Sequence, residues 1–420
     1  MRIATKLLIG SALTLGFLEA GACVVVDRLR PEGVLEAAVP EAAAGRTPEG
    51  TASVRSEPRL AKKHVVHPYL GFMAKKAPEP RSAFVHRMDR ADFYLPSSPA
   101  FSHDENDLIV GITGGSVSSL FAMGAGSETL REELAEMPRF AGRNIEFLVL
   151  GAGGVKQPQQ LIALEWLLIQ GGRVDVLINI DGFNEIALHE VDNEPHGVAP
   201  IYPRMWRLRV GRLDVAEIFG EREYLIGRRR DLATGLAESP LKQLHLRQLL
   251  WIARDRALRY ATLDVENRLR SEGIRRSEFF AGRGPRRPDS TIDSRREAMV
   301  ELWKQGSLML DERCEARQIE YYHFLQPNQH VVGSKPLTDE EKKSAIGGDD
   351  GYGAYVPEAY PLLRDAGVEL YEAGVRFHDL TDVFADRTET LYIDTCCHVN
   401  ELGNELLAHA IAEAIESWGR

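Results

Sequence analysis

Five apolar runs of strand length constrain the fold of this chain more than any other feature of its sequence. The runs read "LIVGITG", "IEFLVLGAG", "VDVLINIDG", "IEYYHFLQP" and the shorter "VRFHDLT", at 108–114, 145–153, 174–182, 319–327 and 375–381. Such nearly continuous apolar runs indicate strands that are buried on both faces, as in a parallel sheet.

Helical patterns lie between these runs, among them residues 158–172 and 296–318. Strands that alternate with helices imply right-handed crossovers, with helices on both faces of the sheet. We therefore predict a three-layer α/β fold, built on a doubly wound sheet of about five parallel strands. At 420 residues with 44% apolar content, the chain is long enough for one enlarged domain or for two.

The alternation of strands and helices breaks between about 186 and 293, where the pattern is helical. Residues 203–287 hold 19 arginines and one lysine against 11 acidic residues, although the net charge of the chain is −11. We predict a helical insertion in a domain that spans 64–420. It is either a solvated surface or a cap that attracts an anionic substrate or a membrane. The overall negative charge disfavours nucleic acid as the partner.

Residues 1–26 have the layout of a secretory signal peptide. Arg2 and Lys6 precede an apolar run at 7–18, and small residues follow it. This pattern predicts export to the cell envelope or periplasm.

A buried N-terminal helix is the alternative to export, and export leaves three fates of this segment open. It is cleaved after Ala22, lipidated at Cys23, or kept as a membrane anchor with Glu19 inside the span. Residues 31–63 are rich in Ala, Glu, Pro and Gly, and we interpret them as a linker.

Polar residues that could bind a ligand or take part in catalysis follow the strands. In open α/β sheets, ligands bind at the carboxyl ends of the strands. Ser116 comes after Gly114 and Gly115, where a helix is predicted to begin. A nucleophilic serine needs an accessible oxygen near a positive helix terminus. The alternative is a serine that only caps the helix. No Gly-Lys-Ser/Thr follows, so a P-loop is excluded.

The next two strand ends offer hydrogen-bond donors. The glycine loop at 151–154 does not fit the dinucleotide-binding pattern, but its backbone N–H groups could form an oxyanion hole. Asn184 follows the third run, where its amide could donate to an oxyanion or simply form a turn.

The segment "YIDTCCHVNELGN" at 392–404 places His398 just before the last predicted helix, with Asn400 as its N-cap. Asp394 could orient one ring nitrogen of His398 while the other nitrogen faces Ser116. A metal site is not expected, because Cys-Cys-His in immediate succession cannot all point at one tetrahedral ion. A redox pair is disfavoured, because adjacent cysteines join only through a strained ring.

Taken together, these blocks resemble the SGNH hydrolase family, also called GDSL esterases, in its exported bacterial form. The shared order is a "GGS" turn, a glycine loop, "GFNE", and D-x-x-x-H-V-N-E-x-G-N before the last helix. The resemblance covers roughly residues 105–418, without the insertion. It implies a flavodoxin-like sheet, an esterase that acts through a serine nucleophile, and no metal or organic cofactor.

The resemblance also implies roles for individual residues. Ser116 is the nucleophile, and His398 and Asp394 complete its catalytic triad. The backbone N–H of Ser116, Gly154 and the amide of Asn184 form the oxyanion hole.

The chain departs from the family pattern at three positions. Gly115 stands where the family usually has Asp, and Val149 stands where Asn is common, so the choice of Gly154 over Gly153 rests on counting from a substituted position. Asp394 lies four residues before His398 rather than three, which leaves Asp382 as the alternative acid.

Two further features belong to this picture. The segment "LQPNQ" at 325–329 is similar to one in exported members of the superfamily, and His330 beside it is expected to be structural or to contact substrate. A disulfide from Cys314 to Cys396 or Cys397 would pin the loop that carries His398.

The predicted function is hydrolysis of an acyl or O-acetyl ester, with a small-molecule, glycan or lipid ester of the cell envelope as substrate. Two alternatives stay open. The same chemistry with a sugar hydroxyl as acceptor gives an O-acyltransferase on a cell-envelope polysaccharide. A non-catalytic glycan-binding protein on the same fold is the other.

Overall fold

The chain divides into two compact units, one from residues 59–209 and 279–420 and one from 1–58 and 210–278. The computed structural model describes residues 16–26, 64–74, 79–102, 104–210, 216–276, 280–285, 291–346 and 351–419. The predicted linker and the first half of the predicted signal segment therefore lie outside the described residues. Within the described ranges, no helix combines the length and the apolarity that crossing a membrane requires.

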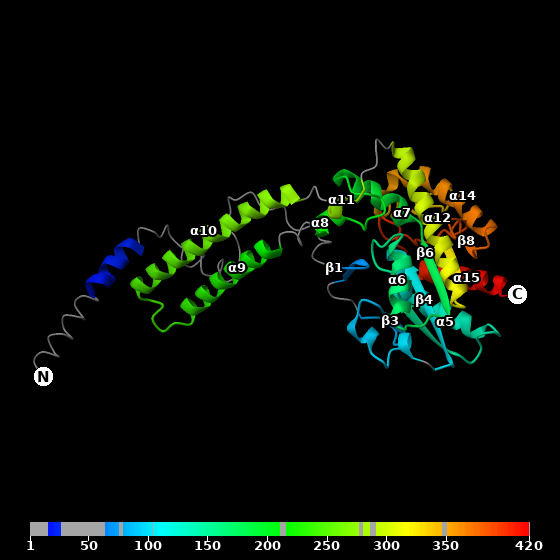
Figure 1. The fold of residues 1–420 in the computed structure, drawn as a ribbon, viewed down its shortest axis with the longest axis horizontal. Helices are drawn as coiled ribbons and strands as arrows, with labels where there is room; N and C mark the ends of the chain where they lie inside the picture. The colour runs from blue at the N-terminus through cyan, green and yellow to red at the C-terminus, as the bar shows by residue number, and fades with distance from the viewer. Residues whose placement is uncertain are drawn as a thin grey trace, which may run out of the picture. The chain divides into compact units, whose positions relative to one another are not determined.

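A parallel sheet of six strands forms the centre of the first unit, with the strand order β3-β5-β4-β6-β7-β8 (Figure 1). Every neighbouring pair in it is parallel. The strands are β3 (Val85–Arg87), β4 (Asp107–Gly114), β5 (Asn144–Val149), β6 (Val176–Asp181), β7 (Glu320–Leu325) and β8 (Phe377–Asp379). The five predicted strands are confirmed. The sixth, β3, is too short to produce an apolar run in the sequence.

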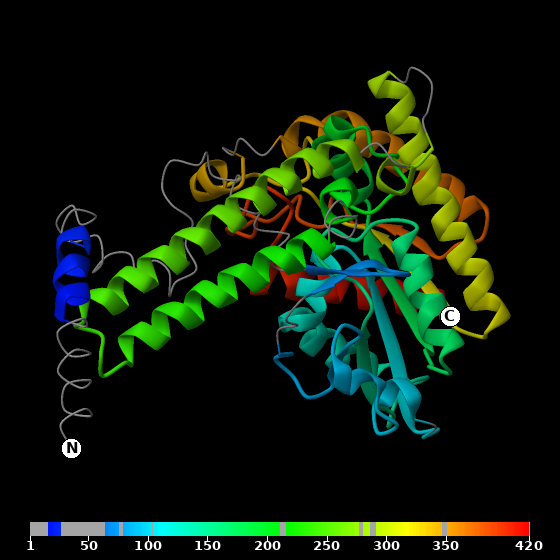
Figure 2. The same ribbon diagram turned by 60° about the vertical axis from the view of Figure 1, so that its left-hand side comes forward.

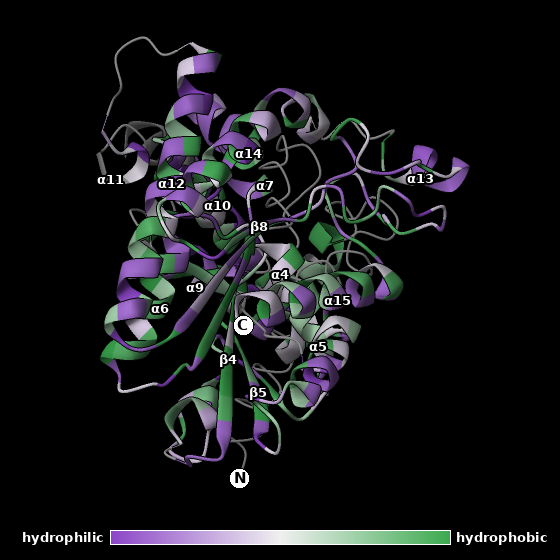
Figure 3. Ribbon diagram, turned by 90° about the vertical axis from the view of Figure 1, so that its right-hand side faces the viewer, coloured by the Kyte–Doolittle hydropathy of each residue, from purple (hydrophilic) through white to green (hydrophobic). Residues whose placement is uncertain are grey.

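Helices cover both faces of this sheet, as Figure 3 shows, and the α/β prediction is confirmed. Helices α5 and α15 pack together on one face, and α6, α12 and α14 form the layer on the other. The helices of this unit are α4 (Ser116–Met123), α5 (Ala125–Glu136), α6 (Gln159–Ile169), α7 (Phe183–Leu188), α8 (Trp206–Val210), α11 (Phe280–Arg283), α12 (Ile292–Ala316), α13 (Asp339–Ser344), α14 (Val356–Glu372) and α15 (Glu401–Trp418). A small antiparallel hairpin, β1 (His64–His67) and β2 (Gly71–Ala74), precedes the sheet.

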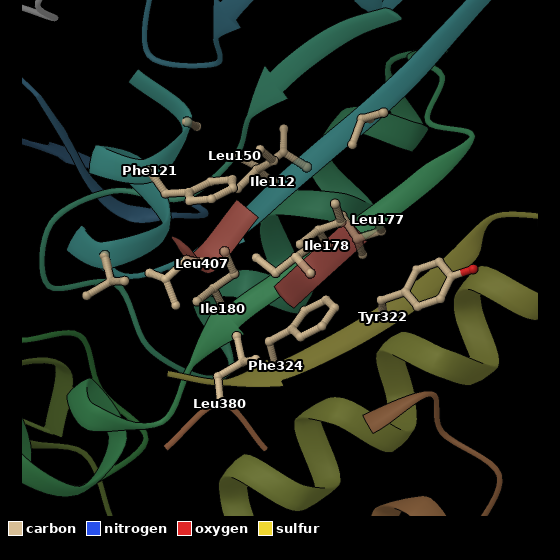
Figure 4. Packing of buried hydrophobic residues seen from close by; sticks show 14 of the residues in the cluster. Ile112, Phe121, Leu150, Leu177, Ile178, Ile180, Tyr322, Phe324, Leu380 and Leu407 are labelled. Atoms are coloured by element: carbon tan, nitrogen blue, oxygen red, sulfur yellow. The ribbon is translucent and has the colours of Figure 1, made fainter. Parts of the chain in front are cut away.

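The core lies between the sheet and its two helical layers. β4 and β6 are buried along almost their whole length, as expected for strands with no solvent-facing side. Figure 4 shows Ile112 of β4 and Ile180 of β6 in one cluster with Phe121 of α4 and Leu407 of α15. Burial of each such side chain contributes roughly 1.5–3 kcal/mol, so this cluster fixes the strand ends that follow it.

The second unit is built on two long helices, α9 (Ala216–Ala237) and α10 (His245–Arg276), which lie side by side (Figure 1; Figure 2). A small apolar cluster around Trp251 joins them. The buried guanidinium of Arg229 donates to both carboxylate oxygens of Asp255, at 2.8 and 3.2 Å. Part of the positive charge seen in the sequence is therefore neutralised between the two helices.

The helix at 16–26 belongs to the same unit. The carboxylate of Glu19 accepts hydrogen bonds from the backbone N–H groups of His245 and Leu246, at 2.5 and 2.9 Å. These donors are among the unpaired N–H groups of the first turn of α10, so Glu19 caps that helix. The one acidic residue of the predicted signal or anchor segment thus has a structural partner.

The described parts of the predicted insertion at 186–293 are mainly helical, as expected, although residues 197–205 form turns and irregular structure. Its separate compact unit is narrower, however, and spans 210–278. Residues 186–209 pack with the sheet instead. The interpretation of the insertion as a cap stays a prediction.

Candidate active site

The carboxyl ends of the parallel strands bring the predicted site residues to one edge of the sheet. Ser116 follows β4, the glycine loop follows β5 and Asn184 follows β6. These three strands are neighbours, because β4 pairs with β5 on one side and with β6 on the other. The sheet topology therefore gathers segments that lie far apart in the sequence.

A tight turn places Ser116 as the first residue of α4, with Gly115 as N-cap. Gly114 has a φ of +127°, and a Cβ atom there would lie 2.1 Å from the carbonyl oxygen of Ile180. Only glycine fits this position, because both the conformation and the space exclude a side chain. Within the described residues the Ser116 hydroxyl makes no hydrogen bond, and it is partly exposed.

The amide of Asn184 packs against this turn. A Cβ atom on Gly115 would lie 2.0 Å from Asn184 Nδ2, so the amide touches the backbone directly before Ser116. Asn184 Nδ2 also donates to the carbonyl oxygen of Val155 at 2.7 Å. One of its two hydrogens is thereby used, and the side chain is held between the glycine loop and the serine turn.

Glu185 fixes the same loop to the start of α7. Its carboxylate accepts hydrogen bonds from the N–H of Gln157 at 3.0 Å and the N–H of Gly182 at 3.1 Å. Burial and the nearby charge of Asp181 raise the pKa of Glu185 to about 8. Glu185 is therefore a fully buried residue that holds the segment after the glycine loop against the start of α7.

Two glycines of the loop face different neighbours. A Cβ atom on Gly153 would have only Ser116 Cβ within 4 Å, at 4.0 Å, whereas one on Gly154 would lie 2.8 Å from Arg204 Cδ. Gly153 thus borders the serine, and Gly154 lies against the arginine. Arg204 also donates to the hydroxyl of Tyr352 at 2.5 Å and pairs with Asp192.

The predicted acid and base are directly bonded. His398 Nδ1 and Asp394 Oδ2 are 2.5 Å apart. The other oxygen, Asp394 Oδ1, accepts from the backbone N–H groups of Cys396, Cys397 and His398 at 3.0, 3.3 and 3.3 Å. The extra residue between acid and base is accommodated because the chain turns around this carboxylate.

These bonds govern the charge of Asp394 and the orientation of His398. Burial alone would raise the pKa of Asp394, but the hydrogen bonds from His398 and the loop N–H groups outweigh it and hold the pKa below its ordinary value. The second ring nitrogen, His398 Nε2, is buried and has no hydrogen-bond partner in the described part of the chain.

The segment after β7 anchors the loop that carries His398. Gln329 Nε2 donates to the carbonyl oxygen of Asp394 at 3.0 Å, and Asn328 Nδ2 donates to that of Cys396 at 3.3 Å. His330 Nε2 lies 3.3 Å from the carbonyl oxygen of Thr395, which agrees with the structural role considered for it. Since β7 neighbours β6, these contacts bring the loop to the sheet edge that holds Ser116 and Asn184.

A buried ion pair supports the same loop from the other side. Glu341 accepts from Lys335 Nζ at 2.8 Å, and from the N–H groups of Leu391 and Tyr392 at 2.8 and 3.0 Å. Burial alone would raise the pKa of Glu341, but the ammonium and the backbone donors outweigh it and lower the pKa to about 2.

The structure thus brings Asp394 to His398 and Asn184 to the turn of Ser116. No hydrogen bond links Ser116 to His398 among the described residues. The alternative acid, Asp382, pairs with Arg364 at 3.0 Å instead.

The disulfide considered between Cys314 and Cys396 or Cys397 is not present. These three cysteines form no disulfide. Cys314 lies near the end of α12, whose chain leads into the start of β7, whereas Cys396 is bonded to Asn328 beyond the end of β7. Six residues of extended strand separate these levels, far more than the roughly 4–7 Å between the Cα atoms of a disulfide.

The side chains of Cys396, Cys397 and His398 lie closer together than their succession in the sequence led us to expect. The Sγ atoms of Cys396 and Cys397 are 3.4 Å apart, and with a ring nitrogen of His398 they form three donors within 4.8 Å of one another. The turn of the chain around Asp394 accompanies this proximity.

A second Ser, His and Asp set lies inside the sheet unit. His323 Nδ1 is 2.7 Å from Ser307 Oγ, and His323 Nε2 is 2.8 Å from Asp181 Oδ1. Trp303 Nε1 also donates to Asp181, at 2.6 Å. All three members of the set are at most 1% exposed, so no substrate reaches them.

The sequence did not indicate Arg204 or Glu341, because each acts through a contact between distant segments, nor Lys335, whose partner Glu341 lies six residues away. Asn328 and Gln329 of the segment "LQPNQ" are buried and act by donating to carbonyl oxygens of the loop that carries His398. No protein-family model and no curated protein matches this sequence.

Proposed function

We propose that this protein is a serine ester hydrolase in which Ser116 is the nucleophile, His398 the general base and Asp394 the residue that orients the base. The observation that carries the proposal is the state of the imidazole. Its Nδ1 is held by Asp394, while its Nε2 is buried without a partner. An imidazole in that state can accept a proton from a hydroxyl, and Asp394 stabilises the resulting imidazolium.

The sheet topology supports the proposal. Without β3, the strands follow the order β5-β4-β6-β7-β8, which is the 2-1-3-4-5 order of flavodoxin-like folds. Ligands bind such folds where the strand order reverses, here between β4 and β6. Ser116 and Asn184 follow these two strands, as the resemblance to SGNH hydrolases requires.

The reaction would begin as Ser116 Oγ attacks the ester carbonyl carbon and gives its proton to His398 Nε2. The tetrahedral intermediate collapses, the C–O bond to the alcohol breaks, and the alcohol leaves with that proton. Water then attacks the acyl-serine ester with the same base, which frees the acid and restores Ser116. Catalytic hydrogen bonds often tighten only when substrate binds, so the missing Ser116 to His398 bond is compatible with these steps.

The oxyanion would be stabilised at the turn itself. The N–H of Ser116 is one of the unpaired donors at the start of α4, and Asn184 Nδ2 keeps one hydrogen that no described residue uses. The N–H groups of Gly153 and Gly154 border the same place, with Gly153 the nearer to Ser116.

Two departures from the family pattern have physical reasons on this proposal. A side chain at Gly115 would collide with Asn184 Nδ2, so an aspartate does not fit there while the amide keeps its position. The four-residue spacing from Asp394 to His398 is compatible with the orienting role, because the loop turns around the carboxylate.

Covalent labelling tests the proposal directly. A fluorophosphonate probe should react with Ser116 and be found on its peptide by mass spectrometry. Label on another serine, or none on folded protein, would contradict the proposal. The buried Ser307 is an internal control, since its geometry resembles a triad without access.

The substrate is proposed as an acyl or O-acetyl ester of a cell-envelope glycan or lipid. Acetate release from acetylated polysaccharide, compared with fatty acid release from lysophospholipid, separates the two classes. Product analysis with an added sugar acceptor separates hydrolysis from acyl transfer, because a transferase moves the acyl group to that hydroxyl.

A further inference from the structure

The thiol–imidazole cluster, defined as Cys396, Cys397 and His398, has a geometry that ester hydrolysis does not need. The two Sγ atoms are 3.4 Å apart, and all three donors lie within 4.8 Å of one another. Zn–S bonds of about 2.3 Å at a tetrahedral angle separate two sulfur atoms by roughly 3.8 Å. Small rotations of the cysteine side chains would therefore place both thiolates on one ion.

The hydrogen bonding of His398 matches that of many zinc-bound histidines. Zinc-binding histidines commonly hold one ring nitrogen against a carboxylate, which orients the ring and raises the basicity of the other nitrogen. Asp394 does this at Nδ1 over 2.5 Å. The other nitrogen, Nε2, is the buried atom without a partner among the described residues. The same hydrogen bond thus prepares the ring for a proton or for a metal ion.

We propose that Cys396, Cys397 and His398 bind a Zn²⁺ ion, and that the bound ion switches off the hydrolase by occupying the imidazole. Two thiolates and one imidazole are ligands that zinc prefers. Each cysteine gives up its thiol proton on binding, and the fourth coordination position is left to water. The binding rests on the cluster alone. The inhibition rests on the proposed function.

A zinc competition assay tests the binding without any activity. The full-length protein, kept reduced with a phosphine, is titrated with Zn²⁺ against a chromophoric zinc chelator. We expect one zinc ion per chain. Loss of an outer partner of a ligand weakens metal binding about 10- to 100-fold, and loss of a ligand costs at least as much. Cys396→Ser and Cys397→Ser should each show such a loss.

The matched control is Cys314→Ala, which removes a buried thiol at the other edge of the sheet and should bind zinc like the parent chain. Circular dichroism establishes that each variant is folded. Unchanged zinc affinity in a folded Cys396→Ser/Cys397→Ser double variant overturns the proposal.

Hydrolysis of p-nitrophenyl acetate tests the inhibition. Zn²⁺ should lower the rate of the parent and of Cys314→Ala, and EDTA should restore it. In each cluster cysteine variant, the inhibition constant, measured against the zinc-free rate of that variant, should rise by at least about tenfold. Equal inhibition of parent and cluster variants overturns the inhibitory role. If zinc binds and no ester is hydrolysed, the proposed function fails while the site stands. If ester is hydrolysed and no zinc binds, the site alone fails.

Discussion

The chain contains two sets of Ser, His and Asp side chains, and they differ in what their histidines leave unpaired. Inside the sheet unit, both ring nitrogens of His323 are bonded, one to Ser307 and one to Asp181. At the sheet edge, Asp394 holds only one nitrogen of His398, and the other has no partner among the described residues. The buried set therefore has the more complete hydrogen-bond network, and the set at the sheet edge keeps an unpaired ring nitrogen.

The two histidines also differ in exposure, because His323 is fully enclosed whereas the side chain of His398 is 18% exposed, although its Nε2 atom is covered. A buried polar group without a partner costs about 1–3 kcal/mol, so an interior network is selected for complete pairing. A catalytic base has the opposite requirement, because it needs a free lone pair that a substrate-bound proton can reach. The serines of the two sets differ in the same direction. Ser116 is partly exposed and its hydroxyl is unbonded among the described residues, whereas Ser307 is fully buried.

The largest expected effect comes from Ser116→Ala. Loss of the nucleophile should lower kcat for a p-nitrophenyl ester by roughly 10⁴- to 10⁶-fold, as for the nucleophile of a serine triad. The melting temperature should change little, because no hydrogen bond of the described residues involves this hydroxyl. Substantial hydrolysis by the pure variant would contradict the role of Ser116 as nucleophile.

Asp394→Asn should follow with a loss of roughly 10²- to 10⁴-fold in kcat, because an amide favours the wrong tautomer of His398 and no longer stabilises its cation. The comparison is with Asp181→Asn, which removes the charge from the buried set. That variant should instead lose about 3–5 kcal/mol of unfolding free energy in urea. An inactive but fully stable Asp181→Asn protein would contradict the assignment of a purely structural role to the buried set.

Asn184→Ala tests the oxyanion hole at the serine turn. Removal of one preorganised donor should lower kcat by about 10²- to 10³-fold with little change in KM, since the donor acts mainly in the transition state. A rise in KM at constant kcat would indicate that Asn184 binds the ground state of the substrate instead.

The ion pair of Glu341 and Lys335 predicts how the free energy of unfolding changes at low pH. The folded-state pKa of Glu341, about 2, lies below its ordinary value of 4.5, so the stabilisation is present above about pH 4.5 and is lost as the pH falls toward 2. The loss is on the order of 3 kcal/mol. Urea unfolding at several pH values should show a shallower acid dependence in Glu341→Gln than in the parent. If the unfolding free energies of Glu341→Gln and the parent depend on pH in the same way, Glu341 is not the source of the acid sensitivity.

The strands and the main site residues could be predicted because each leaves a local signal. Burial on both faces produces apolar runs, and glycine followed by serine marks the turn at Ser116. His398 was singled out because it precedes a capped helix, and Asn184 because it directly follows a strand.

The rest of the site depends on contacts between segments that the sequence does not place together. Arg204 reaches Gly154 from a different segment, and Glu341 reaches the backbone at Leu391 across 50 residues. The proximity of Cys396, Cys397 and His398 was not foreseen for a related reason. Spacing alone did not reveal that Asp394 gathers three consecutive N–H groups and turns the loop.

The smallest expected effect, and the sharpest contrast with Ser116→Ala, comes from Ser307→Ala. The change leaves His323 Nδ1 without its partner at 2.7 Å and removes the contact with the Tyr321 hydroxyl at 3.2 Å. The unfolding free energy should fall by about 1–3 kcal/mol, while kcat stays close to that of the parent. For a unit of this size the melting temperature should drop by about 2–4 °C per kcal/mol. Because both variants remove one serine hydroxyl, opposite outcomes for activity and stability would separate the two sets. Loss of activity in a folded Ser307→Ala protein would instead connect the buried network to catalysis.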